Sequence, residues 1–159
     1  MPPALVLGLG NPLSGADAFG PAVLDRLRAG GGKESLELVD AGTDLLASMD
    51  RFADHEQIVL VDAVLASGDT GVAVYTEAQF STWDDRSRGA HALSPLMVVK
   101  LFRAMVAGSE GRDPHGPPAR PRITLIAYLV DEAAFGRPPD ADTIAAGVAA
   151  VQEVAGRSL

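Results

Sequence analysis

The segment Ile58-Val59-Leu60-Val61-Asp62 decides the fold of this sequence. Its first four residues are apolar and three of them are β-branched, which is typical of a strand buried on both faces of a sheet. A carboxylate directly after such a strand loses its hydration unless a ligand or a helix N-terminus compensates for it. Asp62 is therefore a candidate functional residue.

Four more apolar runs predict further strands, at residues 4–9, 35–39, 71–75 and 123–130. Helices are predicted from residues 17, 44, 94 and 140, with Ser94 and Asp140 or Asp142 as N-caps. The inward faces predicted for the last two helices are Leu93, Met97, Leu101 and Met105, and Ile144, Val148, Val151 and Ala155. Alternating strands and helices predict a three-layer α/β/α sandwich around a mostly parallel five-stranded sheet.

Length and composition predict a single domain over residues 1–159, with a flexible Gly/Pro-rich loop at 108–121. The 13 basic and 21 acidic residues give a net charge of −8, which disfavours nucleic acids and anionic membranes as partners. The absence of cysteine excludes disulfides, thiolate metal sites and a cysteine nucleophile. No secretory signal or membrane-spanning run is apparent, so we expect a cytoplasmic protein.

Polar residues follow three of the predicted strands, at the edge where ligands bind in parallel sheets. Asn11 and Asp17 follow the first strand, Asp40 the second and Asp62 the third, and His91 precedes a predicted helix. Carboxylates and an imidazole form a site suited to a divalent first-row metal such as Ni²⁺ or Zn²⁺. Two of the carboxylates and the imidazole are therefore predicted to form a metal site at this edge.

Each candidate also has a purely structural interpretation. Asp17 could stabilise the N-terminus of the helix that follows it, and Asp40 is more typical of an Asx turn than of a metal ligand. His91 could be an ordinary loop residue. His55 is expected to be a solvated loop residue, and no specific role is expected for His115.

The sequence resembles the hydrogenase maturation endopeptidases over nearly its whole length. The resemblance rests on residues 5–13 (LVLGLGNPL), 17–20 (DAFG), 40–43 (DAGT), 59–64 (VLVDAV) and His91. It implies the same α/β sandwich and a cytoplasmic endopeptidase. Its implied partner is the precursor of a [NiFe]-hydrogenase large subunit, whose C-terminal extension is removed after nickel has been installed.

The resemblance also implies roles for individual residues. Asp17, Asp62 and His91 would bind the metal and take part in catalysis. The expected ion is Ni²⁺ supplied by the substrate, with Zn²⁺ or Cd²⁺ able to replace it in a crystal. Whether the base is a metal-bound water or Asp40 stays open. The implied substrate-binding positions are Asn11, Gly42 and Thr43.

Two positions depart from the family pattern. Ala16 stands where the family often has a second acidic residue, and Ala41 stands in a loop that more usually carries a double glycine. Because alanine avoids the positive φ angles that glycine accepts, Ala41 could restrict this loop. We interpret both departures as changes in which large subunit is recognised.

Two other functions are compatible with parts of the sequence. Gly8-Leu9-Gly10-Asn11-Pro12 also resembles the start of peptidyl-tRNA hydrolases, but the Thr-Arg-His-Asn run that follows there is missing here, and the net charge opposes tRNA binding. A non-catalytic chaperone that senses nickel could use the same ligands as a peptidase. Loss of the precursor's tail would separate the peptidase from the chaperone.

Overall fold

The protein forms one mixed five-stranded sheet in a computed structural model that describes residues 3–31, 35–83, 94–107 and 120–157. The sheet order is β2-β1-β3-β5-β4; the first four of these strands are parallel and the edge strand β4 is antiparallel to β5. This arrangement confirms the predicted mostly parallel sheet. The strands are β1 Ala4–Leu9, β2 Leu36–Gly42, β3 Gln57–Leu65, β4 Gly71–Thr76 and β5 Arg122–Val130.

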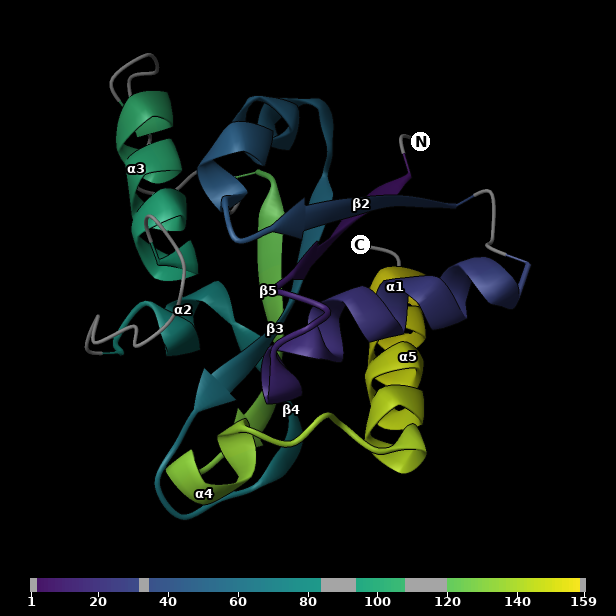
Figure 1. The fold of residues 1–159 in the computed structure, drawn as a ribbon. Coiled ribbons are helices and arrows are strands. Elements are labelled where there is room, and N and C mark those ends of the chain that lie inside the picture. The colour runs from purple at the N-terminus through teal and green to yellow at the C-terminus, as the bar shows by residue number, and fades with distance from the viewer. Residues whose placement is uncertain (1–2, 32–34, 84–93, 108–119, 158–159) are drawn as a thin grey trace.

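Helices cover both faces of the sheet (Figure 1). One face is covered by α1 and α5, which contact each other, and the other by α3 and the 3₁₀ segment η2. The three-layer α/β/α sandwich expected from the sequence is thus confirmed. The helical segments are η1 Gly15–Ala18, α1 Phe19–Ala29, η2 Leu45–Asp54, α2 Glu77–Phe80, α3 Pro95–Ala107, α4 Glu132–Phe135 and α5 Ala141–Gly156.

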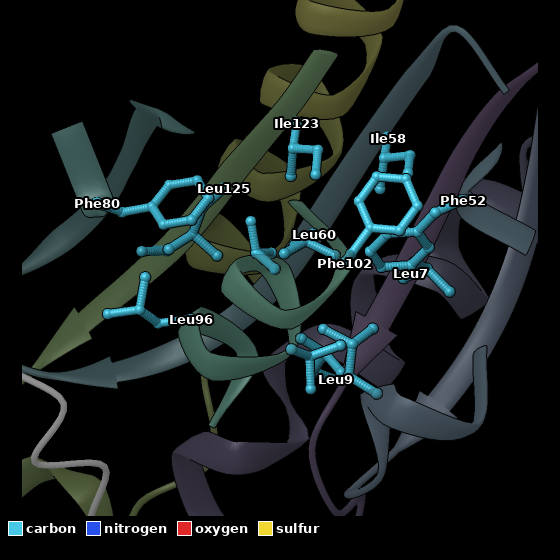
Figure 2. Close-up of a cluster of buried hydrophobic side chains, with 14 of the residues drawn as sticks. Leu7, Leu9, Phe52, Ile58, Leu60, Phe80, Leu96, Phe102, Ile123 and Leu125 are labelled. Atoms are coloured by element: carbon cyan, nitrogen blue, oxygen red, sulfur yellow. The ribbon is translucent and has the colours of Figure 1, made fainter. Parts of the chain in front are cut away.

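The side chains of β1 alternate between two hydrophobic cores, as the two-residue period of a strand requires. Leu5, Leu7 and Leu9 face the core under α3 and η2, where Phe52 and Phe102 meet edge-to-face with ring centroids 5.2 Å apart (Figure 2). The residues between them face the other core, under α1 and α5. Burial on both faces explains why the parallel strands are almost continuously apolar.

Helix α1 approaches the sheet closely where β1 and β3 end. A side chain on Gly20, in its first turn, would put a Cβ atom 2.2 Å from the carbonyl oxygen of Leu9 and 2.7 Å from that of Val61. Only glycine fits at this distance. The close contact fixes the start of α1, and the loop that leads into it, against the ends of these two strands.

Two predicted N-caps are present. The hydroxyl of Ser94 accepts a hydrogen bond from the N–H of Met97 at 3.2 Å, and the carboxylate of Asp140 accepts one from Thr143 at 2.7 Å. The segment predicted as a short helix near residue 45 is a 3₁₀ helix, and the side chain of Asp44 does not cap it.

The inward face predicted for α3 is wrong. Met97, Leu101 and Met105 are 42%, 41% and 58% exposed, whereas the core side of the helix consists of Leu96, Val98, Val99 and Phe102. The helix is apolar around most of its circumference, so its spacing pattern does not identify the buried side. The aromatic ring of Phe102 lies in the core.

The prediction of a solvated His55 is also wrong. This residue is buried, its Nδ1 lies 2.9 Å from the carbonyl oxygen of Arg51, and its Nε2 lies 2.8 Å from Oε2 of Glu37. Arg51 donates to the other oxygen of Glu37 at 2.7 Å. These contacts connect η2 to β2 at the amino edge of the sheet. The sequence did not predict them.

Two further predictions concern the loop at 108–121 and membrane-spanning segments. Most of the loop predicted at 108–121 lies outside the described residues, and so does His115. Within the part of the chain that is described, no helix is both long and apolar enough to cross a membrane.

Candidate functional site

The order of the strands places a topological switch point between β1 and β3. The chain leaves β1 through α1 on one face of the sheet to reach β2, and it leaves β2 through η2 on the opposite face to reach β3. Because the two connections diverge, the carboxyl ends of β1 and β3 are where ligands bind in sheets of this kind. Asp17 and Asp62 belong to these two ends.

Asp17 lies in η1, between the end of β1 and the start of α1. The residue is 8% exposed, and its Oδ2 accepts a hydrogen bond from the backbone N–H of Asn11 at 2.8 Å. The carboxylate therefore closes the loop that precedes it. Helix α1 begins two residues later, at Phe19, with Ala18 as its N-cap residue.

Gly10 makes this arrangement of Asp17 sterically feasible. Its φ is +119°, and a Cβ atom there would lie 2.0 Å from the backbone oxygen of Asp17 and 3.0 Å from its Oδ1. Its N–H also donates to the carbonyl oxygen of Gly42 at 2.8 Å. Gly10 thus links the loop after β1 to the end of β2, a role that its place in the sequence did not indicate.

The buried carboxyl group of Asp62 has a raised pKa. It is 4% exposed; burial raises the pKa of its carboxyl well above the ordinary value of 3.8, and the negative charge of Asp17 raises this pKa further. The segments that carry the two residues, η1 and β3, are in contact. Two buried acidic residues at one edge of the sheet can bind a cation, whose charge would favour the ionised form of both carboxyl groups.

The position of Asp62 differs slightly from the prediction. The sequence predicts it at the end of a strand, whereas β3 continues to Leu65 because β5 pairs with it over that whole length. Pairing with β1 stops at Val61. Asp62 is therefore the first residue of β3 beyond its register with β1, and by strand alternation it faces the side covered by α3.

Asp40 lies near the carboxyl end of β2, where it pairs with Gly8 of β1 and leads into the loop that follows the strand. The carboxylate of Asp40 is exposed and accepts a hydrogen bond from the N–H of Gly42 at 3.0 Å, which is the Asx turn that the sequence favoured. Gly42 has a φ of +56°, whereas no other residue type in the described ranges has a positive φ, so Ala41 fits this loop without strain. Thr43 is half-buried in the same loop.

Asn11 uses its side chain locally. Its Oδ1 accepts a hydrogen bond from the N–H of Leu13 at 2.9 Å, and its backbone oxygen accepts one from Ser14 at 3.1 Å. The N–H of Asp17 in turn donates to the oxygen of Ser14 at 3.0 Å. Residues 11–17 therefore form a succession of hydrogen-bonded turns, and Asn11 holds their first part.

The third predicted ligand, His91, lies outside the described residues. Among the residues that are described, no three His, Cys, Asp or Glu side chains are grouped as a metal site would require. Of the three predicted ligands, the structure therefore describes Asp17 and Asp62, on the contacting segments η1 and β3. Ser94, three residues after His91 in the sequence, begins α3 on the face to which Asp62 belongs.

Fold and site together define the class: a three-layer α/β sandwich with a buried carboxylate pair at its switch point. No family model and no curated protein matches the sequence. Among solved structures, the fold is that of the [NiFe] hydrogenase maturation proteases. HybD from Thermococcus kodakarensis is 23% identical with a TM-score of 0.61, and the match covers 97% of each chain. HybD from E. coli is 18% identical with a TM-score of 0.65, and the match covers 96% of this chain and 91% of that one. The hydrogenase 2 maturation peptidase from Thaumarchaeota archaeon SCGC_AB-539-E09 is 22% identical with a TM-score of 0.60, and the match covers 97% of this chain and 98% of that one.

Proposed function

We propose that this protein is an endopeptidase that removes the C-terminal extension of the nickel-loaded large subunit of a [NiFe]-hydrogenase. The observation that carries the proposal is the buried pair Asp17 and Asp62 at the switch point of the sheet. Support comes from solved hydrogenase maturation proteases, which share the fold over nearly the full length of both chains.

In this proposal the nickel ion belongs to the substrate. Asp17, Asp62 and His91 would bind it together, so that the precursor docks productively only when nickel is present. The donor set fits the ion, because carboxylate and imidazole groups suit borderline divalent metals. Since the raised pKa of Asp62 favours its protonated form, binding of the cation would displace a proton from this carboxyl.

The loops around the pair would hold the tail of the precursor. Gly42, the last residue of β2, accepts a hydrogen bond from Gly10, and Thr43 follows it. Gly10 in turn closely approaches Asp17. A peptide that reached the carboxylate pair would pass these residues. The proton acceptor for the attacking water would be either Asp40, which is exposed beside this loop, or the water's own metal-bound form.

The test is cleavage of a nickel-loaded large-subunit precursor, followed by mass spectrometry. The wild-type protein should remove the tail, whereas Asp62→Asn, Asp17→Asn and His91→Ala should not, with circular dichroism showing that each variant is folded. Asp69→Asn makes the same chemical change at an exposed turn residue and should leave cleavage unchanged. Normal processing by Asp62→Asn would contradict the proposed site. Binding of the precursor with no change in its mass would instead indicate a nickel-sensing chaperone.

A further inference from the structure

Leu13 is the most exposed large apolar side chain in the part of the molecule that the structure describes. It is 93% exposed, whereas the other exposed large apolar residues lie between 39% and 58%. Those residues still bury about half of their surface, as single surface apolar residues commonly do. Leu13 makes almost no contact with its own chain.

The backbone that carries Leu13 is nevertheless held in place. Its N–H donates to Oδ1 of Asn11 at 2.9 Å, and the N–H of Asn11 donates to Oδ2 of Asp17 at 2.8 Å. The next residue, Ser14, donates to the oxygen of Asn11 and accepts from the N–H of Asp17. Leu13 is thus held outward by a turn whose hydrogen bonds end on a carboxylate of the proposed site.

The C-terminal part of the same loop packs against α4. A Cβ atom on Gly15 would lie 2.5 Å from the carbonyl oxygen of Phe135, so η1 and α4 are in close contact. A loop fixed at both ends loses little conformational entropy when a partner binds its apolar residue. This distinguishes Leu13 from an apolar residue on a loosely held loop.

We infer that Leu13 is a specificity-determining contact that inserts into an apolar pocket on the surface of the folded protein substrate. This inference rests on the proposed function, because the turn places Leu13 four residues from Asp17, where the substrate would dock. We take the occupant to be the folded surface next to the metal, because apolar anchor residues at interfaces fill well-packed pockets on the partner. Docking would bury the leucine and help to align the metal-bearing part of the substrate with the carboxylate pair.

The test compares the kinetics of Leu13→Ala, Leu13→Asp and Leu13→Met on the nickel-loaded precursor. Leu13→Asp should lower kcat/KM by about tenfold or more, which corresponds to about 1.4 kcal/mol, through a higher KM at an unchanged kcat. Leu13→Ala should have a smaller effect in the same direction. Leu13→Met, which keeps the apolar volume, should retain most of the wild-type KM.

Met105→Asp is the matched control. Met105 is 58% exposed near the end of α3, and Arg103 in the same turn donates to the oxygens of Arg120 and Pro121, which directly precede β5. This part of α3 therefore lies at the amino edge of the sheet, opposite the proposed site. Met105→Asp introduces the same charge and should leave KM unchanged.

Two further measurements distinguish recognition from an effect on the fold or the metal ligands. The melting temperature of Leu13→Asp and its affinity for free Ni²⁺ should equal those of the wild type. An unchanged KM in Leu13→Asp, or a loss that falls on kcat or Ni²⁺ affinity, would overturn the inference. Failure of the wild-type protein to cleave any such precursor would instead refute the proposed function.

Discussion

The N–H of Asn11 and Oδ2 of Asp17 are joined by a 2.8 Å hydrogen bond that closes the loop between β1 and α1. The bond fixes the orientation of the Asp17 carboxylate before any ligand arrives. The negative charge of Asp17 also raises the pKa of Asp62, which lies 45 residues later in the sequence. A short loop and a distant strand thereby form one acidic site.

Asp62→Asn should increase the stability of the metal-free protein at neutral pH. The folded state raises the pKa of Asp62, so the folded protein holds a proton that the unfolded chain releases near pH 3.8. Stability from this group therefore falls as the pH rises above about 3.8, and asparagine removes that loss. We expect a gain of about 0.5 to 2 kcal/mol at pH 7 and a smaller gain near pH 4, measured by urea unfolding. A variant less stable than the wild type at pH 7 would contradict this account.

Gly10→Ala should abolish cleavage and destabilise the fold. Its Cβ would overlap the backbone of Asp17, and its φ of +119° is unfavourable for alanine, which together should cost more than about 3 kcal/mol. Gly68→Ala is the control, because φ there is +106° but nothing lies within 4 Å of the added Cβ. Thermal unfolding should show a smaller loss for Gly68→Ala, and its cleavage rate should match that of the wild type.

Glu37→Gln should weaken the protein at neutral pH more than in acid. The hydrogen bond from His55, followed by the charges of His55 and Arg51, holds the pKa of Glu37 below its ordinary value of 4.5. The stabilisation is therefore present above about pH 4.5 and is lost as the pH falls through the lower folded-state value. Because the Glu37 side chain is 35% exposed, we expect a loss below about 1 kcal/mol that shrinks in high salt. Equal losses at pH 3 and pH 7 in thermal melts would exclude this ion cluster as the cause.

Neighbouring residues on α3 should differ sharply in their contribution to stability. Phe102→Ala removes a ring that is 5% exposed and contacts Phe52, and should cost about 3 to 5 kcal/mol. Leu101→Ala removes a side chain that is 41% exposed and should cost less than about 1 kcal/mol. Denaturant titrations of the two variants measure both values. Similar losses would mean that the helix is oriented differently.

Much of the fold could be predicted because its strands are buried on both faces. Such strands appear as unbroken apolar runs, and the run around Leu60 also directed attention to Asp62, the polar residue that follows it. Caps such as Ser94 and Asp140 were equally accessible, since a cap is a contact between residues three apart. These features depend on local sequence alone.

Other features required the assembled structure. The buried side of α3 was predicted wrongly, because a helix that is apolar all round can face the core in several ways and the shape of the sheet selects one. His55 looked like a loop residue, since its partner Glu37 lies 18 positions earlier. The close approach of Gly10 to the backbone of Asp17 depends on how the loop folds and is not visible in the sequence.

The amino-acid sequence by itself determined the order of strands and helices and the candidate acids Asp17 and Asp62, because hydrophobic periodicity and the cost of burying charge act locally along the chain. The tertiary structure alone decided that the segments carrying these two acids are in contact, that the pKa of Asp62 is raised, and that Leu13 projects outward from the loop closed by Asp17. Electrostatic coupling and burial depend on distances between segments remote in sequence, and those distances exist only after the sheet has formed.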